Sequence, residues 1–169
     1  MPILRLLLES GADHDQIVRA DGTTLLHYAV ETHRAAAAEL LLQYGANPSA
    51  TRRSGTTPLH LAIRSGQEFV AESLLFSGAS FTLVDRNGQT PLHLAASKNM
   101  WRLVKLMMDR PEFDISLANK AGRTALQVAE EGHHEDTVNV LKGLRPKAAE
   151  RWESKVYKLP KQQRSDRER

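Results

Sequence analysis

The sequence predicts an all-α solenoid, a fold in which short helix-turn-helix units stack in one direction. Three observations predict it. A six-residue motif recurs four times, at Thr24, Thr57, Thr90 and Thr124, so that successive copies begin 33, 33 and 34 residues apart. A glycine stands two residues before each copy. Aromatic residues make up only 5% of the 169 residues, so Leu, Val and Ala must build the core. This period is typical of solenoids, whose units bury their apolar faces against their neighbours.

Each repeat is expected to contain a turn, a short first helix and a second helix, as the second copy illustrates. Gly55 can supply the positive φ of a tight turn. Thr57 is the expected N-cap, and Pro58 the first helical residue. Gly66 can end this helix in the left-handed conformation. A second helix with one apolar side should then follow and stop at Gly78.

This layout resembles the ankyrin repeat. The string Gly-x-Thr-Pro-Leu-His-Leu-Ala occurs intact at 55–62 and 88–95. The resemblance spans roughly residues 3–144, and it implies antiparallel helix pairs with projecting β-hairpin loops, called fingers here. The expected units are a partial N-terminal repeat at 1–18, four repeats at 19–51, 52–84, 85–118 and 119–145, a capping helix at 146–159 and a disordered basic tail at 160–169.

Some repeats depart from this pattern where the first helix ends. His33 and Asn99 stand at the position of Gly66, and asparagine tolerates the left-handed region better than histidine does. In the fourth repeat, Gly132 comes one position early and Gln127 replaces the histidine of the motif.

The two ends of the array need cover. Residues 2–10 are expected to form a second helix without its first helix, with Leu4, Leu7 and Leu8 on one apolar face. Leaving two leucines exposed would forgo about 3–6 kcal/mol of burial. We therefore hypothesise that the chain is part of a longer array or that a partner covers this end.

The C-terminal end has apolar residues at heptad spacing after Pro146, namely Ala149, Trp152, Val156 and Leu159. We expect a helix that caps the fourth repeat. A partner-binding amphipathic segment and disorder are the alternatives.

The composition excludes several classes of function. The absence of cysteine excludes disulfides and thiolate chemistry. There is no apolar run of about 18 residues and no signal-peptide layout, so we expect an intracellular protein, in the cytoplasm and/or nucleus, without a membrane span. The net charge of +3 is uneven, because residues 145–169 hold nine Lys/Arg against four Asp/Glu and the rest hold fourteen against sixteen.

The motif histidines His27, His60 and His93 could suggest a metal site, but their spacing argues against it. Packed helices lie about 8–10 Å apart, whereas two ligands of one zinc ion lie within about 4 Å. The His133–Asp136 cluster lies at a helix start, where the helix dipole alone favours acidic residues. We expect no metal and no cofactor. The resemblance instead implies structural roles for Thr24, His27, Thr57, His60, Thr90, His93 and Thr124, with the histidines tying neighbouring turns together.

No catalytic residues are predicted. The chain lacks a nucleophile-elbow pattern and a glycine-rich phosphate loop. The paired carboxylates Glu130 and Glu131 lie on a solvated helix end. We therefore expect neither an enzyme nor a small-molecule substrate.

The resemblance implies that a partner lies along the concave side, on the finger tips and the exposed side of the first helices. The residues carried over are Asp21, Glu31, Arg53, Arg64, Arg86, Asn87, Gln89, Lys98, Lys120 and Arg123. Six of those in repeats two to four are basic, which should steer an acidic partner towards the C-terminal repeats. The alternative is that these charges only solvate the turns. Trp101, on a second helix, is a candidate aromatic contact, with a structural role as its alternative.

The favoured function is a non-catalytic scaffold that binds a partner protein. The alternative is the substrate-recruiting ankyrin region of a larger multidomain enzyme or ubiquitin-ligase adaptor. Nucleic-acid or membrane-surface binding through the basic tail is disfavoured, because Trp152 and Tyr157 are the only aromatic residues among its basic ones.

Overall fold

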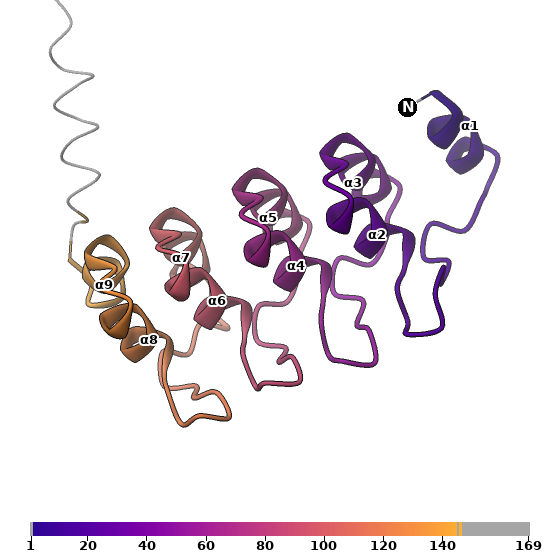
Figure 1. Ribbon diagram of the computed structural model, residues 1–169. Coiled ribbons are helices and arrows are strands. Elements are labelled where there is room, and N and C mark those ends of the chain that lie inside the picture. The colour runs from indigo at the N-terminus through magenta and orange to yellow at the C-terminus, as the bar shows by residue number, and fades with distance from the viewer. Residues whose placement is uncertain (1, 145, 147–169) are drawn as a thin grey trace, which may run out of the picture.

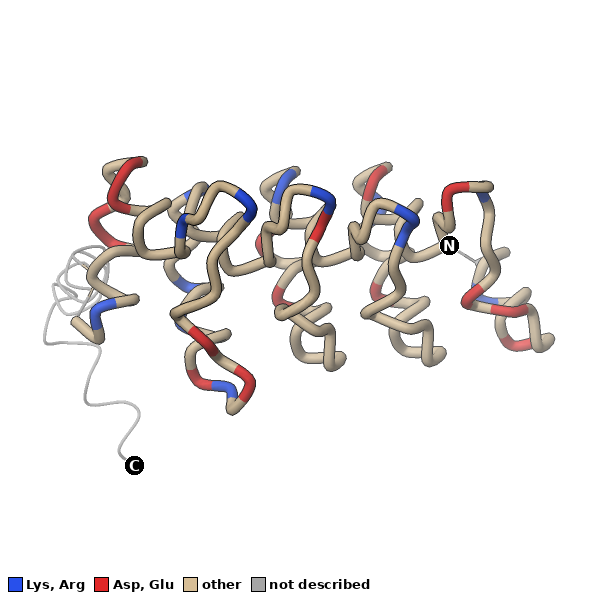
Figure 2. The backbone as a smooth tube through the Cα atoms, turned by 90° about the horizontal axis from the view of Figure 1, so that it is seen from below, with Lys and Arg blue, Asp and Glu red and all other residues tan. Residues whose placement is uncertain are grey.

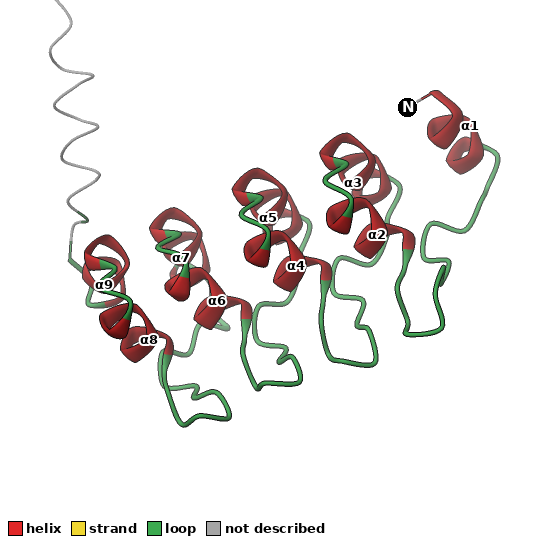
Figure 3. Ribbon diagram, viewed as in Figure 1, coloured by secondary structure: helices red, strands yellow, loops and turns green. Residues whose placement is uncertain are grey.

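The computed structural model describes residues 2–144 and 146, and over these residues it consists of helices joined by loops (Figure 1, Figure 3). Helix α1 (Pro2–Glu9) stands alone at one end. The helix pairs that follow are α2 (Leu25–Glu31) with α3 (Ala35–Gln43), α4 (Pro58–Arg64) with α5 (Glu68–Phe76), α6 (Pro91–Ser97) with α7 (Trp101–Met108), and α8 (Ala125–Glu131) with α9 (Glu135–Leu141). The predicted all-α solenoid is confirmed. The expected tail and all but the first residue of the expected capping helix lie outside the described residues.

The pairs stack in one row, and the core runs along that row. The first helices α2, α4, α6 and α8 contact one another in sequence, as do the second helices α3, α5, α7 and α9. Leu26, Leu59 and Leu74 are fully buried in this core, together with the small residues Ala62 and Ala71. Each unit therefore buries its apolar face against its neighbours.

Each first helix begins at a threonine cap and ends at a left-handed residue. Thr57 accepts a hydrogen bond from the His60 backbone and donates its own N–H to the His60 side chain, which closes a capping box. At the other end, Gly66 has a φ of 74°, as predicted, and His33 and Asn99 have φ of 56° and 55°. In the fourth repeat Gly132 is right-handed, and His133 takes the left-handed position with a φ of 54°. The early glycine therefore leaves a histidine in the position that favours glycine.

The fingers join each second helix to the next first helix, and they project from one side of the stack (Figure 3). The expected β-hairpins are not formed as strands in the described part of the chain. Two fingers carry single antiparallel bridges instead, Ile17 to Thr24 and Ala118 to Thr124. Each finger turns within a few residues, with Gly88 at a φ of 68°, and closes its turn with single backbone hydrogen bonds such as that from the Asp85 N–H to the Gln89 carbonyl oxygen, which is too short a ladder to form strands.

The apolar face of helix α1 is only partly covered by the rest of the described chain. Leu8 is 7% exposed and Leu4 is half-buried, whereas Leu7 is 52% exposed. Leu4 and Leu8 are four residues apart and share one helix face, while Leu7 lies to its side. The predicted apolar face is therefore covered at Leu4 and Leu8 and exposed at Leu7.

Candidate partner-binding surface

Three cations occupy the same place in three successive fingers. Arg53, Arg86 and Lys120 each stand two residues before the turn glycine, and each side chain is exposed. We call these three residues the tip cations. Within residues 2–144 and 146, none of them forms an ion pair. Figure 2, which looks onto the fingers, shows basic positions recurring along the row.

Backbone hydrogen bonds hold neighbouring fingers in register. The Arg53 N–H donates to the Asp21 carbonyl oxygen at 2.8 Å, and the Lys120 N–H donates to the Asn87 carbonyl oxygen at 3.2 Å. The second and third fingers also approach each other closely. A Cβ atom added to Gly55 would lie only 2.4 Å from the Val84 carbonyl oxygen. The tip cations therefore stand on a stacked platform rather than on independent loops.

Two further cations of the predicted surface are neutralised within the chain. Arg64 pairs with Asp85, whose side chain is fully buried and also accepts from the Asn87 N–H at 2.7 Å. Arg123 pairs with Glu131 at the end of α8. These two guanidinium groups already have carboxylate partners, so they offer less to a binding partner than the tip cations do.

Glu31, at the end of α2, is held between two arginines. Its carboxylate accepts from Arg19 at 2.8 Å and from Arg52 at 3.2 Å. The hydrogen bond from Arg52 lowers the pKa of Glu31 below its usual value. Asp21 accepts from the Thr23 hydroxyl at 2.6 Å and from the Thr23 N–H at 3.0 Å, and these bonds lower its pKa as well. Both acids are therefore ionised at neutral pH, and the exposed Asp21 marks the N-terminal limit of the basic row.

The pairs Glu31–Arg52 and Arg64–Asp85 join equivalent positions in successive repeats with the charges reversed. Each pair links the end of one first helix to the start of the next finger, 21 residues later. Neither Arg52 nor Asp85 was predicted from the sequence. The signal that could have found them is this repeated spacing of opposite charges.

The remaining predicted contact residues do not all lie together. Lys98, which caps the end of α6, is exposed. Gln89 is half-buried in the third finger, and Asn87 is exposed at its tip. Trp101 is half-buried at the start of α7 and packs against the core, with the Arg102 guanidinium 5.4 Å from its ring centroid. Since α7 lies on the side of the stack away from the fingers, Trp101 is not part of the finger surface (Figure 1).

The motif histidines connect each first helix to the following finger. The Nε2 atoms of His27, His60 and His93 lie 3.1, 3.0 and 3.0 Å from the carbonyl oxygens of Thr56, Gln89 and Arg123, respectively. In each case Nδ1 faces the N–H of the capping threonine. Nδ1 therefore accepts, and Nε2 carries the proton and donates to the next repeat.

Burial keeps these histidines neutral. It lowers the pKa of His27 to about 4, and it also lowers the pKa of His60 and His93. In the fourth repeat, the Gln127 Oε1 accepts from the Thr124 N–H at 2.9 Å, which preserves the capping box without an imidazole. Over the described residues, no group of three or more His, Asp or Glu side chains could hold a metal ion.

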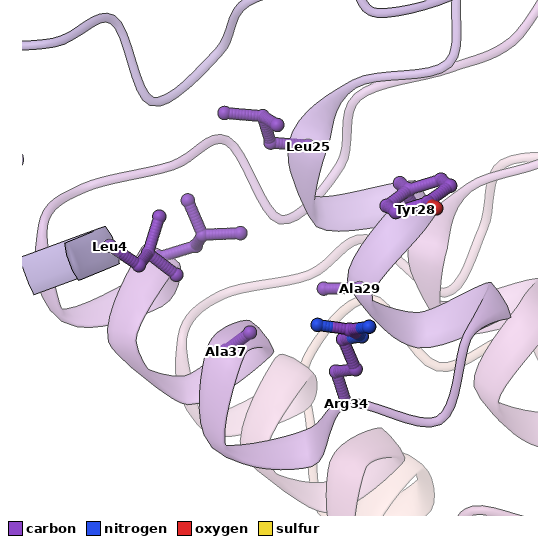
Figure 4. Close-up of a pocket in the computed structure, with 7 residues that line it drawn as sticks. Leu4, Leu25, Tyr28, Ala29, Arg34 and Ala37 are labelled. Carbon is purple, nitrogen blue, oxygen red and sulfur yellow. The ribbon is translucent and has the colours of Figure 1, made fainter. Parts of the chain in front are cut away.

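An apolar pocket of about 330 Å³ opens between α1 and the first complete helix pair. It is lined by Leu4, Leu25, Tyr28, Ala29, Arg34, Ala37 and Leu41 (Figure 4). On α4 and α6 the equivalent face is covered by the preceding first helix, whereas Tyr28 remains 41% exposed.

A family model described as ankyrin repeats (3 copies) matches residues 1–85 and 70–149. The chain has no match among the curated proteins. None of the helices in the described residues is both long enough and apolar enough to pass through a membrane.

Proposed function

The chain belongs to the ankyrin-repeat family, and on this premise we propose that it binds a partner protein on the surface formed by its fingers and first helices. Ankyrin repeats are generally protein-protein interaction modules and typically non-catalytic. The partner surface that we propose is acidic, and it docks mainly on the second to fourth repeats.

The observation that carries this proposal is the row of tip cations on fingers held in register. Glu31, Asp85 and Glu131 each form an ion pair with an arginine that is not a tip cation. Since each of these pairs is nearly neutral, the positive potential of the three tip cations is largely uncancelled. A preorganised positive surface speeds encounter with an acidic partner and disfavours basic ones. Rigid fingers also reduce the entropy that is lost on binding.

A capture experiment tests the proposal. The purified protein, carrying a photo-crosslinking amino acid in place of Asn87, is incubated with cell extract and irradiated. The same crosslinker placed at the exposed Arg102 on α7 is the control for non-specific capture. We expect specific crosslinks from the finger position and not from α7.

Charge reversal adds the second arm of the experiment. The variant R53E/R86E should lose most of the captured protein, whereas R102E should retain it, with circular dichroism verifying that both variants are folded. Capture that is equal from both crosslinking positions, or that is unchanged in R53E/R86E, would contradict the proposal.

A further inference from the structure

We infer that the segment recognised by this surface is an extended polypeptide with a carboxylate at every third residue, each one opposite a tip cation. This inference rests on the proposed function and adds the conformation and charge spacing of the partner. It starts from the regularity of the tip cations, which stand before turn glycines of nearly equal conformation, with φ of 74° at Gly55, 68° at Gly88 and 72° at Gly122.

The spacing of the cations follows from the stacking of the repeats. Packed helices lie about 8–10 Å apart, and the three fingers that carry the tip cations are in close backbone contact: a Cβ on Gly55 would lie 2.4 Å from the Val84 carbonyl oxygen, and the Lys120 N–H donates to the Asn87 carbonyl oxygen. An extended chain in the polyproline II conformation rises about 3.1 Å per residue and has three residues per turn, so every third side chain lies on the same side and three residues span about 9 Å. A segment of seven residues therefore reaches all three tip cations with carboxylates at its first, fourth and seventh positions.

A helical partner would need a different sequence. At a rise of about 1.5 Å per residue, carboxylates seven residues apart would match the same spacing on one helix face. That segment needs about 15 residues, and an isolated helix of this length is marginal in water. The extended segment is favoured because it meets the three cations with half the length of ordered chain.

The first finger sets the limit of the acidic stretch. Its equivalent of the tip cations is Ala20, followed by the ionised Asp21. A fourth carboxylate at this point would face like charge, so the next third position of the partner should be neutral or basic. This asymmetry gives the bound segment a register along the row.

Fluorescence anisotropy with synthetic peptides tests the inference. Three labelled 15-residue peptides have the same composition, with three Glu each. In the first peptide the three Glu are spaced three residues apart, in the second they are consecutive, and in the third they are spaced seven residues apart, on one face of a helix. At about 50 mM salt we expect the every-third peptide to bind about tenfold more tightly than the other two. Each of R53Q, R86Q and K120Q should weaken it by about two- to fivefold, the range of an exposed ion pair. The control R102Q, on the opposite side, should leave binding unchanged.

The outcomes separate the two proposals. Equal binding of the consecutive-Glu peptide, tighter binding of the every-seventh peptide, or tighter binding of a single-stranded oligonucleotide would each overturn the inference. If all three peptides fail to bind while protein capture still depends on Arg53 and Arg86, the spacing inference falls and the proposed function stands. If capture is also insensitive to those residues, both fall.

Discussion

At the turn of the second finger, Gly55 is constrained both by its positive φ and by the backbone of the next finger. Gly122 in the fourth finger has only the first of these two constraints. Both glycines have a positive φ, of 74° and 72°. A Cβ on Gly55 would also lie 2.4 Å from the Val84 carbonyl oxygen of the next finger, whereas a Cβ on Gly122 would meet nothing within 4 Å. The two positions therefore separate backbone strain from steric contact between repeats.

We predict that Gly55→Ala destabilises the protein considerably more than Gly122→Ala. A left-handed alanine costs about 1–2 kcal/mol at either site, and only Gly55→Ala adds a clash with backbone. Urea unfolding followed by circular dichroism gives both free energies of unfolding. Equal losses in the two variants would show that the fingers can move apart at no cost.

The buried histidines make stability depend on pH. The unfolded histidine has the ordinary pKa of 6.5, and folding lowers the pKa of His27 to about 4. Between these values the unfolded chain binds more protons than the folded chain, so the free energy of unfolding rises with pH. This contribution is fully present above pH 6.5 and is lost as the pH falls towards 4.

We predict that His27→Gln flattens this profile. Glutamine can preserve the capping box, as Gln127 does, but it does not titrate. Urea unfolding at pH 7, 6 and 5 should show a steeper loss of stability in the unmodified protein than in the variant. Parallel profiles would mean that protonation of His27 does not oppose folding. His27→Ala, which leaves the Thr24 N–H and the Thr56 carbonyl without this partner, should cost about 1–3 kcal/mol at pH 7.

At the scale of elements, every helix of the described chain has seven to nine residues. Helices this short are unstable alone, so contacts between repeats must stabilise them. The first helices α2, α4, α6 and α8 could be predicted from the sequence because their threonine caps and left-handed ends are local signals. The ion pairs between repeats could not, because they join residues 21 positions apart whose proximity depends on the stacking.

The reversed ion pairs lead to a prediction about neighbouring repeats. The variant E31R places a positive charge beside Arg19 and Arg52, and R52D removes a positive partner of Glu31. Each single variant should therefore lower the free energy of unfolding of the protein by about 1 kcal/mol. E31R/R52D recreates the charge order of Arg64 and Asp85 and should recover at least half of the summed loss. A double-mutant cycle by urea unfolding measures this coupling. Additive losses would show that the pair at α2 does not stabilise the junction.

At the scale of the whole molecule, the family resemblance predicts fingers that project from the stacked helix pairs, but it does not predict which of their charges are paired within the chain. From the sequence, six basic residues were expected to form one row. The structure separates the tip cations from Arg64 and Arg123, which are paired with acids. Trp101, which was predicted as a separate aromatic contact on a second helix, is half-buried and packs against the core at the start of α7. Which charges form ion pairs, and which side of the stack a residue faces, depend on the stacking geometry, which a sequence motif does not encode.

The uneven cover along the stack also determines where it opens first. In a solenoid each unit is stabilised by its nearest neighbours, so an end unit with one uncovered side opens at lower free energy. Here α1 exposes Leu6 by 64% and Leu7 by 52%, and the pocket beside it leaves Leu25 and Tyr28 partly uncovered. The helices α4 and α6 are covered on both sides.

We predict that amide hydrogen exchange is fastest in α1, intermediate in α2 and slowest in α4 and α6. The variant L6Q/L7Q should leave global stability nearly unchanged, because both side chains already face water. L8A, which truncates the 7% exposed leucine of the same helix, should accelerate exchange in α1 and α3. Mass spectrometry of exchanged peptides measures both effects. If α1 exchanged as slowly as α6, or if L6Q/L7Q destabilised the protein as much as L8A, the exposed side of α1 would have to be covered in solution, for example by self-association, which light scattering would detect.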